Sequence, residues 1–208
     1  MDSLVGSGFP ERMTTTPNTS VHPTSQRRIG SGVLRTGILI VATMTTGLTA
    51  GVFADWSNAI MPGLNTVDDR TFVAAFRALD TSITNPLFLG VGFMGALLFT
   101  GLSAALHLRA EQRPVLIWVG AALVCYLAVF VITFGVHEPL NEKLRTAGEP
   151  HSNAEFAAAR ALLDEATWTA WNTVRAVAST IAFGCLTWAL VIHRRIGYPS
   201  APRTDELA

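Results

Sequence analysis

Four long apolar stretches constrain the fold more than any other feature of this sequence. A helix needs about 20 mostly apolar residues to cross a hydrocarbon core of roughly 30 Å. Charged residues make up only 14% of the chain, whereas soluble domains carry about 25%. The sequence therefore predicts an all-α fold, an integral membrane bundle of four helices. The predicted spans are Leu34–Trp56, Pro86–Leu108, Pro114–Val136 and Trp171–His193.

The segments outside the spans divide the chain into three parts. Residues 1–30 are rich in Thr, Ser and Pro and lack apolar periodicity, which predicts a disordered tail. Residues 31–196 form the four-span domain, and residues 197–208 form a short polar tail at the other end of the chain.

The loop between the first two spans is expected to contain a short amphipathic helix. Pro62 is predicted to end the first span, and Asp68 or Asp69 to cap the short helix. Asn85 and Pro86 then have the pattern of a helix N-cap and first turn. The residues predicted on the apolar face of the short helix are Phe72, Val73, Phe76, Leu79 and Ile83.

The loop between the last two spans is expected to contain a helical extension. Pro139 is predicted to end the third span, since proline lacks the N–H that a helix interior requires. A helix that begins near Ser152 is expected to run continuously into the fourth span. The first and second spans are rich in small residues, and Gly47 and Gly51 stand four positions apart. Such faces serve helix packing within one chain or a homo-oligomer.

The distribution of charge predicts the orientation in the membrane. The formal net charge is zero, which argues against a protein that binds nucleic acid through a basic surface. Arginines flank the spans on one side of the predicted membrane: Arg27, Arg28, Arg35, Arg109, Arg113, Arg194 and Arg195. The positive-inside rule then places both termini in the cytoplasm of a bacterial-type plasma membrane and the two long loops outside.

This topology collects polar side chains at the outer end of the bundle. Trp168, Trp171, Asn172 and Arg175 share one face of the fourth helix, because their positions differ by three, four and seven. Other polar residues at the same end are Asp55, Asn58, Asn85, His137, Glu138 and Asn141. Charged groups at membrane depth tend to face one another or a cavity, so we expect a small-molecule pocket here.

The candidate catalytic residues of this pocket are His137, Arg175 and Asp55. A guanidinium stabilises an oxyanion in a water-poor site, and His137 is the first candidate for a general base, with Asp55 or Glu138 second. The candidate substrate-binding residues are Asn58, Asn85, Asn141, Trp168, Trp171 and Asn172.

Each of these assignments has a purely structural alternative. Asp55 and Arg175 would form an ion pair that fixes the helix register, or Asp55 would simply reach the water interface. His137 would be an interfacial residue at a helix end. These alternatives remain open on the sequence alone.

No metal or cofactor is expected. His137 and Glu138 are adjacent and so diverge on a helix, and the sequence has no His-x-x-x-His motif and no cysteine pair at ligand spacing. A single histidine with Asp55 or Glu138 remains the alternative, as a site for a metal that prefers oxygen ligands. Cys125 and Cys185 lie within apolar runs and are interpreted as small apolar residues.

Several short motifs resemble a known family in their order and spacing. They are Met61-Pro62-Gly63-Leu64, Phe72-Val73, Asn85-Pro86, Pro139-Leu140-Asn141-Glu142-Lys143-Leu144 and Trp171-Asn172-x-x-Arg175. Over residues 34–195 this pattern is similar to the anthrone oxygenase-like family of small four-span membrane proteins. The positions carried over are Pro62, Asn85, Pro139, Asn141, Trp171, Asn172 and Arg175. The sequence departs from the family at His137, where asparagine is common.

The resemblance implies a function. Fungal members of the family are associated with the oxidation of anthrones to anthraquinones, so it implies cofactor-independent oxidation of a hydrophobic aromatic molecule by O₂ within the lipid bilayer. Two other classes of function remain. In the first, the protein is not catalytic, the polar cluster is structural and the acidic loops bind a partner. In the second, the protein is a small transporter subunit.

Overall fold

The computed structural model describes residues 23–197, which form helices joined by turns, with no strand among them. Four of its helices are long and apolar enough to cross a membrane, which confirms the predicted helical membrane bundle. They are Gly32–Leu64, Pro86–Leu106, Ala110–Arg145 and Glu165–Ile196. The predicted tails at 1–22 and 198–208 lie outside the described residues, whereas residues 23–30 already belong to α1 (Pro23–Asp55).

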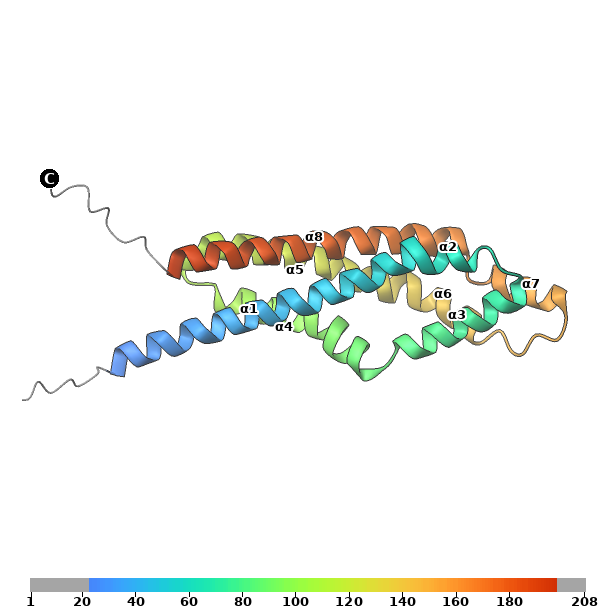
Figure 1. Cartoon of the computed structure of the whole chain (residues 1–208), viewed down its shortest axis with the longest axis horizontal. Helices are drawn as coiled ribbons and strands as arrows, with labels where there is room; N and C mark the ends of the chain where they lie inside the picture. The colour runs from blue at the N-terminus through green and yellow to red at the C-terminus, as the bar shows by residue number, and fades with distance from the viewer. Residues whose placement is uncertain (1–22, 198–208) are drawn as a thin grey trace, which may run out of the picture.

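The helices of the bundle run side by side along its length (Figure 1), and their contacts close a ring. Helix α1 packs against α4 (Gly95–Leu106) and α8 (Glu165–Gly197), and α5 (Arg113–Ile132) packs against the same two helices. The buried positions between them hold many alanines, which let the helix backbones approach closely. These alanines are Ala42, Ala96, Ala122, Ala176, Ala182 and Ala189. We call this hydrophobic cluster the membrane core.

The spans are longer than a membrane requires. A helix of 33 residues, such as Gly32–Leu64, extends for roughly 50 Å, whereas the hydrocarbon layer is about 30 Å thick. The extra length lies at the end of the bundle opposite Pro23 and Gly197, where four short helices lie together (Figure 1). These are α2 (Met61–Leu64), α3 (Asp69–Ile83), α6 (Glu138–Arg145) and α7 (Asn153–Ala161).

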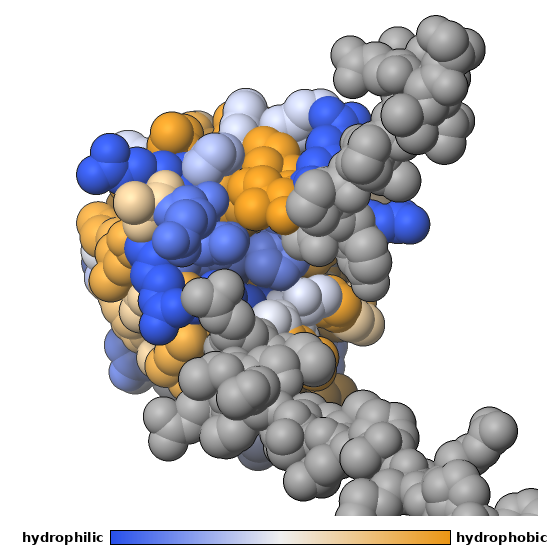
Figure 2. Space-filling model, turned by 90° about the vertical axis from the view of Figure 1, so that its left-hand side faces the viewer, coloured by the Kyte–Doolittle hydropathy of each residue, from blue (hydrophilic) through white to orange (hydrophobic). Residues whose placement is uncertain are grey.

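A second hydrophobic cluster, which we call the cap core, joins these short helices. Its buried residues are Trp56, Met61, Phe72, Val73, Phe76, Leu140, Leu144, Ala159, Leu163 and Trp168. The opposite end of the bundle is different. Figure 2 views the molecule from the end at which α1 begins and α8 ends, and shows hydrophilic residues across the middle of that end with hydrophobic residues beside them.

Helix α3 is the amphipathic helix predicted in the first loop. The carboxylate of Asp68 caps it by accepting hydrogen bonds from the backbone N–H and the hydroxyl of Thr71, which lower the pKa of Asp68. Phe72, Val73 and Phe76 are buried as predicted. The assignment of Leu79 to the buried face is wrong, because that side chain is 37% exposed.

Three of the four spans contain π-helical turns near the cap. They are η1 (Trp56–Ile60), η2 (Pro86–Met94) and η4 (Thr133–His137). The first span ends at Leu64, two residues after Pro62, close to the predicted end. The prediction that Pro139 ends its helix is wrong, since α6 continues directly from η4 to Arg145. A proline ring clashes with the carbonyl one turn earlier in an α-helix. The wider π-turn that precedes each of these prolines relieves that clash.

Two further features differ from the sequence analysis. Ser152 caps α7 as expected, but α7 and α8 are separate helices, because Asp164 adopts a left-handed backbone conformation with φ of 49°. Gly47 lies close to the ring of Phe183, whereas nothing on other elements approaches Gly51. The helix-contact face of α1 therefore includes only the first glycine of the pair.

Arg77 connects α3 to the end of α6. Its guanidinium donates to the carbonyl oxygen of Leu144 at 2.8 and 3.0 Å and to that of Gly148 at 2.9 Å.

We expect Arg77→Met to lower the free energy of unfolding by about 1–3 kcal/mol, because these carbonyls lose a charged donor. Thermal unfolding in detergent micelles measures the change.

Lys143→Met is the matched control, since this exposed residue also lies near the end of α6. A stability loss as large for Lys143→Met as for Arg77→Met would show that the attachment of α3 does not depend on these hydrogen bonds.

Candidate functional site

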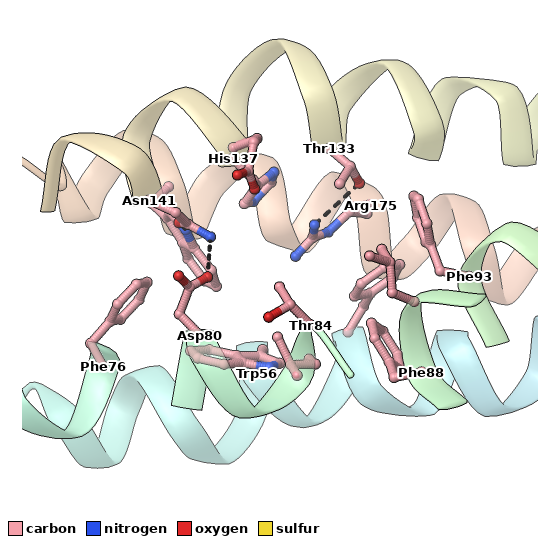
Figure 3. Close-up of a pocket in the computed structure, with 15 residues that line it drawn as sticks. Trp56, Phe76, Asp80, Thr84, Phe88, Phe93, Thr133, His137, Asn141 and Arg175 are labelled. Carbon is pink, nitrogen blue, oxygen red and sulfur yellow. Dashed lines mark hydrogen bonds between the residues drawn. The ribbon is translucent and has the colours of Figure 1, made fainter. Parts of the chain in front are cut away.

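A cavity lies between the membrane core and the cap core. Phe53 and Phe93 belong to the membrane core, and Trp56, Phe76 and Trp168 belong to the cap core. The other lining residues are Asp80, Ile83, Thr84, Phe88, Leu89, Thr133, His137, Glu138, Asn141 and Arg175. All three π-helical turns contribute to the wall, and Figure 3 shows polar side chains projecting into the space among aromatic rings.

Arg175 provides a positive charge in this wall. The residue is only 6% exposed, and its Nη1 and Nη2 donate to Thr133 Oγ1 at 3.2 Å and Asn172 Oδ1 at 2.7 Å. The guanidinium carbon lies 3.9 Å from the centre of the Phe53 ring. In the described part of the chain no carboxylate pairs with Arg175, and its buried Nε–H has no acceptor.

Asn172 holds the guanidinium in place. Its Nδ2 donates to the Phe53 carbonyl at 3.1 Å and to Ser57 Oγ at 2.7 Å. Both amide hydrogens are therefore directed at α1 and η1, and the amide oxygen is left to face Arg175. The arrangement fixes Arg175 with neutral acceptors only, which leaves its positive charge available to a ligand.

His137 lies on η4 and is 1% exposed. Its Nδ1 is 3.4 Å from the carbonyl oxygen of Ile132, which can only accept a hydrogen bond, so we assign the ring hydrogen of neutral His137 to Nδ1. Nε2 then carries the free lone pair, and it has no protein partner. The ring packs edge to face against Trp168 with centroids 5.0 Å apart.

A chain of hydrogen bonds closes the cap side of the cavity. Trp168 Nε1 donates to Asn141 Oδ1 at 2.8 Å, and Asn141 Nδ2 donates to Asp80 Oδ1 at 2.8 Å. The other oxygen of Asp80 pairs with Arg145 at 3.0 Å. This chain joins α8, α6 and α3, and Figure 3 shows Asp80 and Asn141 meeting across the space. Arg145 also pairs with Glu138, a lining residue at the rim.

Asp80 is a charged lining residue that was not predicted from the sequence. Thr133, Phe53 and the other aromatic lining residues apart from Trp168 were not predicted either. It is 6% exposed, and its position follows from helix periodicity, since it stands four residues after Phe76 and three before Ile83. The sequence alone favoured Leu79 because of its apolar side chain. The burial of Asp80 depends on partners from α6, whose position the sequence does not reveal.

Of the predicted site residues, the structure brings His137, Asn141, Trp168 and Arg175 into the cavity wall, and Asn172 lies behind Arg175.

The other four predicted site residues lie away from the cavity. Asp55 and Asn58 are exposed, and Asn58 lines a separate groove between η1 and α8. Asn85 caps η2 as predicted, accepting from the Phe88 N–H at 2.9 Å. Trp171 is 42% exposed.

The structure contains no ion pair between Asp55 and Arg175 among the salt bridges of the described residues. The interior face of α1 and η1 consists of Phe53 and Trp56, and Asp55 stands between them on another side of the helix. The alternative in which this pair sets the helix register is therefore wrong. Within residues 23–197, no three His, Cys, Asp or Glu side chains are grouped so that they could hold a metal ion.

Comparison with known proteins finds a similar family. Residues 86–185 match the family model described as anthrone oxygenase. Over this segment the chain is similar to the anthrone oxygenase family. The matched segment runs from η2 to the middle of α8 and includes His137, Asn141, Trp168, Asn172 and Arg175. Searches of the curated proteins and of the solved structures found no match.

The hydrogen-bond chain through Asn141 predicts a large effect on stability. Asn141→Leu leaves the Trp168 indole N–H and one oxygen of buried Asp80 without partners, so we expect the free energy of unfolding to fall by about 2–5 kcal/mol. Thermal unfolding in detergent measures it. Asn58→Leu is the matched control, because Asn58 is exposed. Equal stability of the two variants would contradict the structural role of the chain.

Proposed function

We propose that this protein oxidises an aromatic, membrane-soluble molecule with O₂ in the cavity, without a cofactor. One observation carries the proposal: an unpaired guanidinium, on Arg175, and a buried imidazole nitrogen without a partner, His137 Nε2, line the same cavity. The first stabilises negative charge on an oxygen and the second accepts a proton. The match to the anthrone oxygenase family supports the same chemistry.

The proposed reaction begins with removal of a proton from the CH₂ group that stands opposite the carbonyl in the central ring of an anthrone. His137 Nε2 takes this proton, and the electron pair delocalises onto the oxygen as an enolate. Arg175 stabilises the enolate, because its charge has no carboxylate partner and its Nε–H has no acceptor. An aromatic enolate is electron-rich enough to react with O₂ directly.

The remaining steps balance without another reactant. The enolate carbon passes electrons to O₂ and forms a C–O bond, and the proton held by His137 completes a hydroperoxide. Loss of the second proton from that carbon, with cleavage of the O–O bond, releases water and leaves a ketone. The sum converts a CH₂ group and O₂ into a carbonyl group and water.

The aromatic wall favours a flat substrate. Trp56, Phe76 and Trp168 lie on the cap side, and Phe88 and Phe93 on η2. Aromatic rings offer a fused-ring substrate offset-stacked or edge-to-face contacts. Figure 3 shows His137, Asn141 and Arg175, from η4, α6 and α8, across the space from Trp56, Phe76 and Phe88. Trp168 lies on the side of these polar groups, where it packs against His137.

We also propose that the cap lies outside a bacterial-type plasma membrane and that both termini are cytoplasmic. The arginines flanking the spans at the end of the termini support this orientation. A green fluorescent protein fused to the C-terminus should fluoresce, since it folds in the cytoplasm, whereas an alkaline phosphatase fused there should be inactive. An active phosphatase fusion would reverse the orientation.

Two substitutions test the proposed catalytic roles. We expect His137→Gln to lower turnover by about 10²–10⁴-fold, because glutamine cannot act as the base. We expect Arg175→Lys to lower it by about 10²–10³-fold, because lysine keeps the charge but not the geometry that Asn172 and Thr133 impose. Oxygen uptake and anthraquinone formation from anthrone are measured in proteoliposomes, with protein-free vesicles giving the rate of spontaneous oxidation.

Asp55→Asn is the control for a general effect of removing charge, since Asp55 is exposed and outside the cavity. Its turnover should equal that of the unmodified protein. Turnover in folded His137→Gln and Arg175→Lys that matches the Asp55→Asn value would contradict the proposed function.

A further inference from the structure

The exposed part of the cavity wall shows where the cavity opens. Most lining residues are buried, but Thr84 and Leu89, just before and within η2, are exposed. Thr133 and Glu138, at the two ends of η4, are half-buried. The mouth therefore lies on the flank of the bundle, between η2 and η4.

The helix packing leaves this flank open. Segment η2 packs against α1 and α4, and η4 packs against α5, α6 and α8, but η2 and η4 do not pack extensively against each other. At the edge of the cavity farthest from the cap the same two spans are in contact. There Phe93 of η2 lies against Phe130 of α5 and Phe134 of η4, with ring centroids 5.8 and 6.2 Å apart. The opening between η2 and η4 therefore lies on the cap side of Phe93.

The surface around the mouth is apolar. Leu87 and Val91 on η2 are 74% and 55% exposed, and Val131 and Phe134 on the facing span are 67% and 48% exposed. Such a band in a membrane protein faces lipid. Toward the cap the rim becomes polar, with Thr84 and Glu138. The mouth therefore extends from the hydrocarbon layer to its polar boundary.

The end that faces water is closed by the cap core. The indole of Trp56 lies 5.6 Å from the ring of Phe76 and 5.3 Å from that of Trp168, and Phe76 lies 5.8 Å from Trp168. The hydrogen bonds from Asn141 to Asp80 and from Trp168 to Asn141 reinforce the closure. A molecule moving along the bundle axis from the water meets this packed layer.

We propose that the opening between η2 and η4 is a lateral portal through which an apolar small molecule enters the cavity from the lipid. The polar edge of the molecule passes Thr84 and Glu138, while its apolar body passes Leu89. The identity of the molecule as an oxidisable aromatic compound rests on the proposed function. The portal itself does not, because any apolar molecule of suitable size would use it.

Tryptophan fluorescence tests the portal without turnover. The chain has five tryptophans, and the triple variant Trp118→Phe, Trp171→Phe, Trp188→Phe keeps only the buried Trp56 and Trp168 of the cavity wall. In phosphatidylcholine proteoliposomes we expect 1-bromooctane, which dissolves in the bilayer, to quench this emission. Iodide added to the water on either side should leave it unchanged.

A variant of the rim locates the entry. Leu89→Phe narrows the mouth and should remove most of the quenching by 1-bromooctane. Leu98→Phe is the matched control, since Leu98 is 66% exposed on α4 and does not line the cavity, and its quenching should match that of the triple variant alone.

Three results would overturn the portal: quenching by iodide in place of 1-bromooctane, no quenching by either, or equal effects of the two phenylalanine substitutions. Quenching as expected in a protein that does not oxidise anthrone would retain the portal and reject the proposed function. Turnover without such quenching would retain the proposed function and reject the portal.

Discussion

The structure depends on a buried positive charge that the protein does not neutralise. Taking a guanidinium out of water costs on the order of several kcal/mol unless other groups replace the water. Arg175 receives two neutral hydrogen-bond acceptors, Asn172 and Thr133, and the face of the Phe53 ring. None of these groups carries a negative charge. An anionic ligand would therefore form the ionic interaction with the guanidinium that a carboxylate forms in most buried salt bridges. The position of α1 against α8, through the bonds from Asn172 to Phe53 and Ser57, is part of the same arrangement.

The π-helical turns explain how the bundle makes room for such a site. Four helices packed through alanines leave little space between them, as in the membrane core. Each π-turn adds a residue to one turn and redirects the following segment. Near η1, η2 and η4 the spans therefore diverge, and their aromatic and polar residues line a cavity between two packed cores. The prolines at 62 and 139 are accommodated by these turns, and the helix continues beyond Pro139 to Arg145.

The sequence predicted the spans because apolar length follows directly from membrane thickness. It also predicted the caps at Asp68 and Asn85, which depend on neighbouring residues only. Four residues were predicted to share the interior face of α8. Three of them, Trp168, Asn172 and Arg175, are buried, and Trp171 is not.

The remaining features depend on contacts between distant segments. Asp80 is buried because Asn141 and Arg145 meet it from α6, and Asp55 is exposed because α8 packs against another side of α1. A glycine lies on a helix-contact face only where another helix packs against it, as α8 does at Gly47 through Phe183. The spacing of residues along one helix does not reveal which other segments will contact it.

The central claim is that Arg175 binds a ligand oxygen in its anionic form. The most direct test is the absorbance of a bound hydroxyanthraquinone, whose phenolate absorbs at a longer wavelength than its phenol. In proteoliposomes, a pH titration of the bound ligand should have its midpoint at lower pH than the same ligand in protein-free vesicles. Arg175→Met should abolish this shift, while Asp55→Asn should retain it. Binding without a shift, or the same shift in Arg175→Met, would contradict the claim.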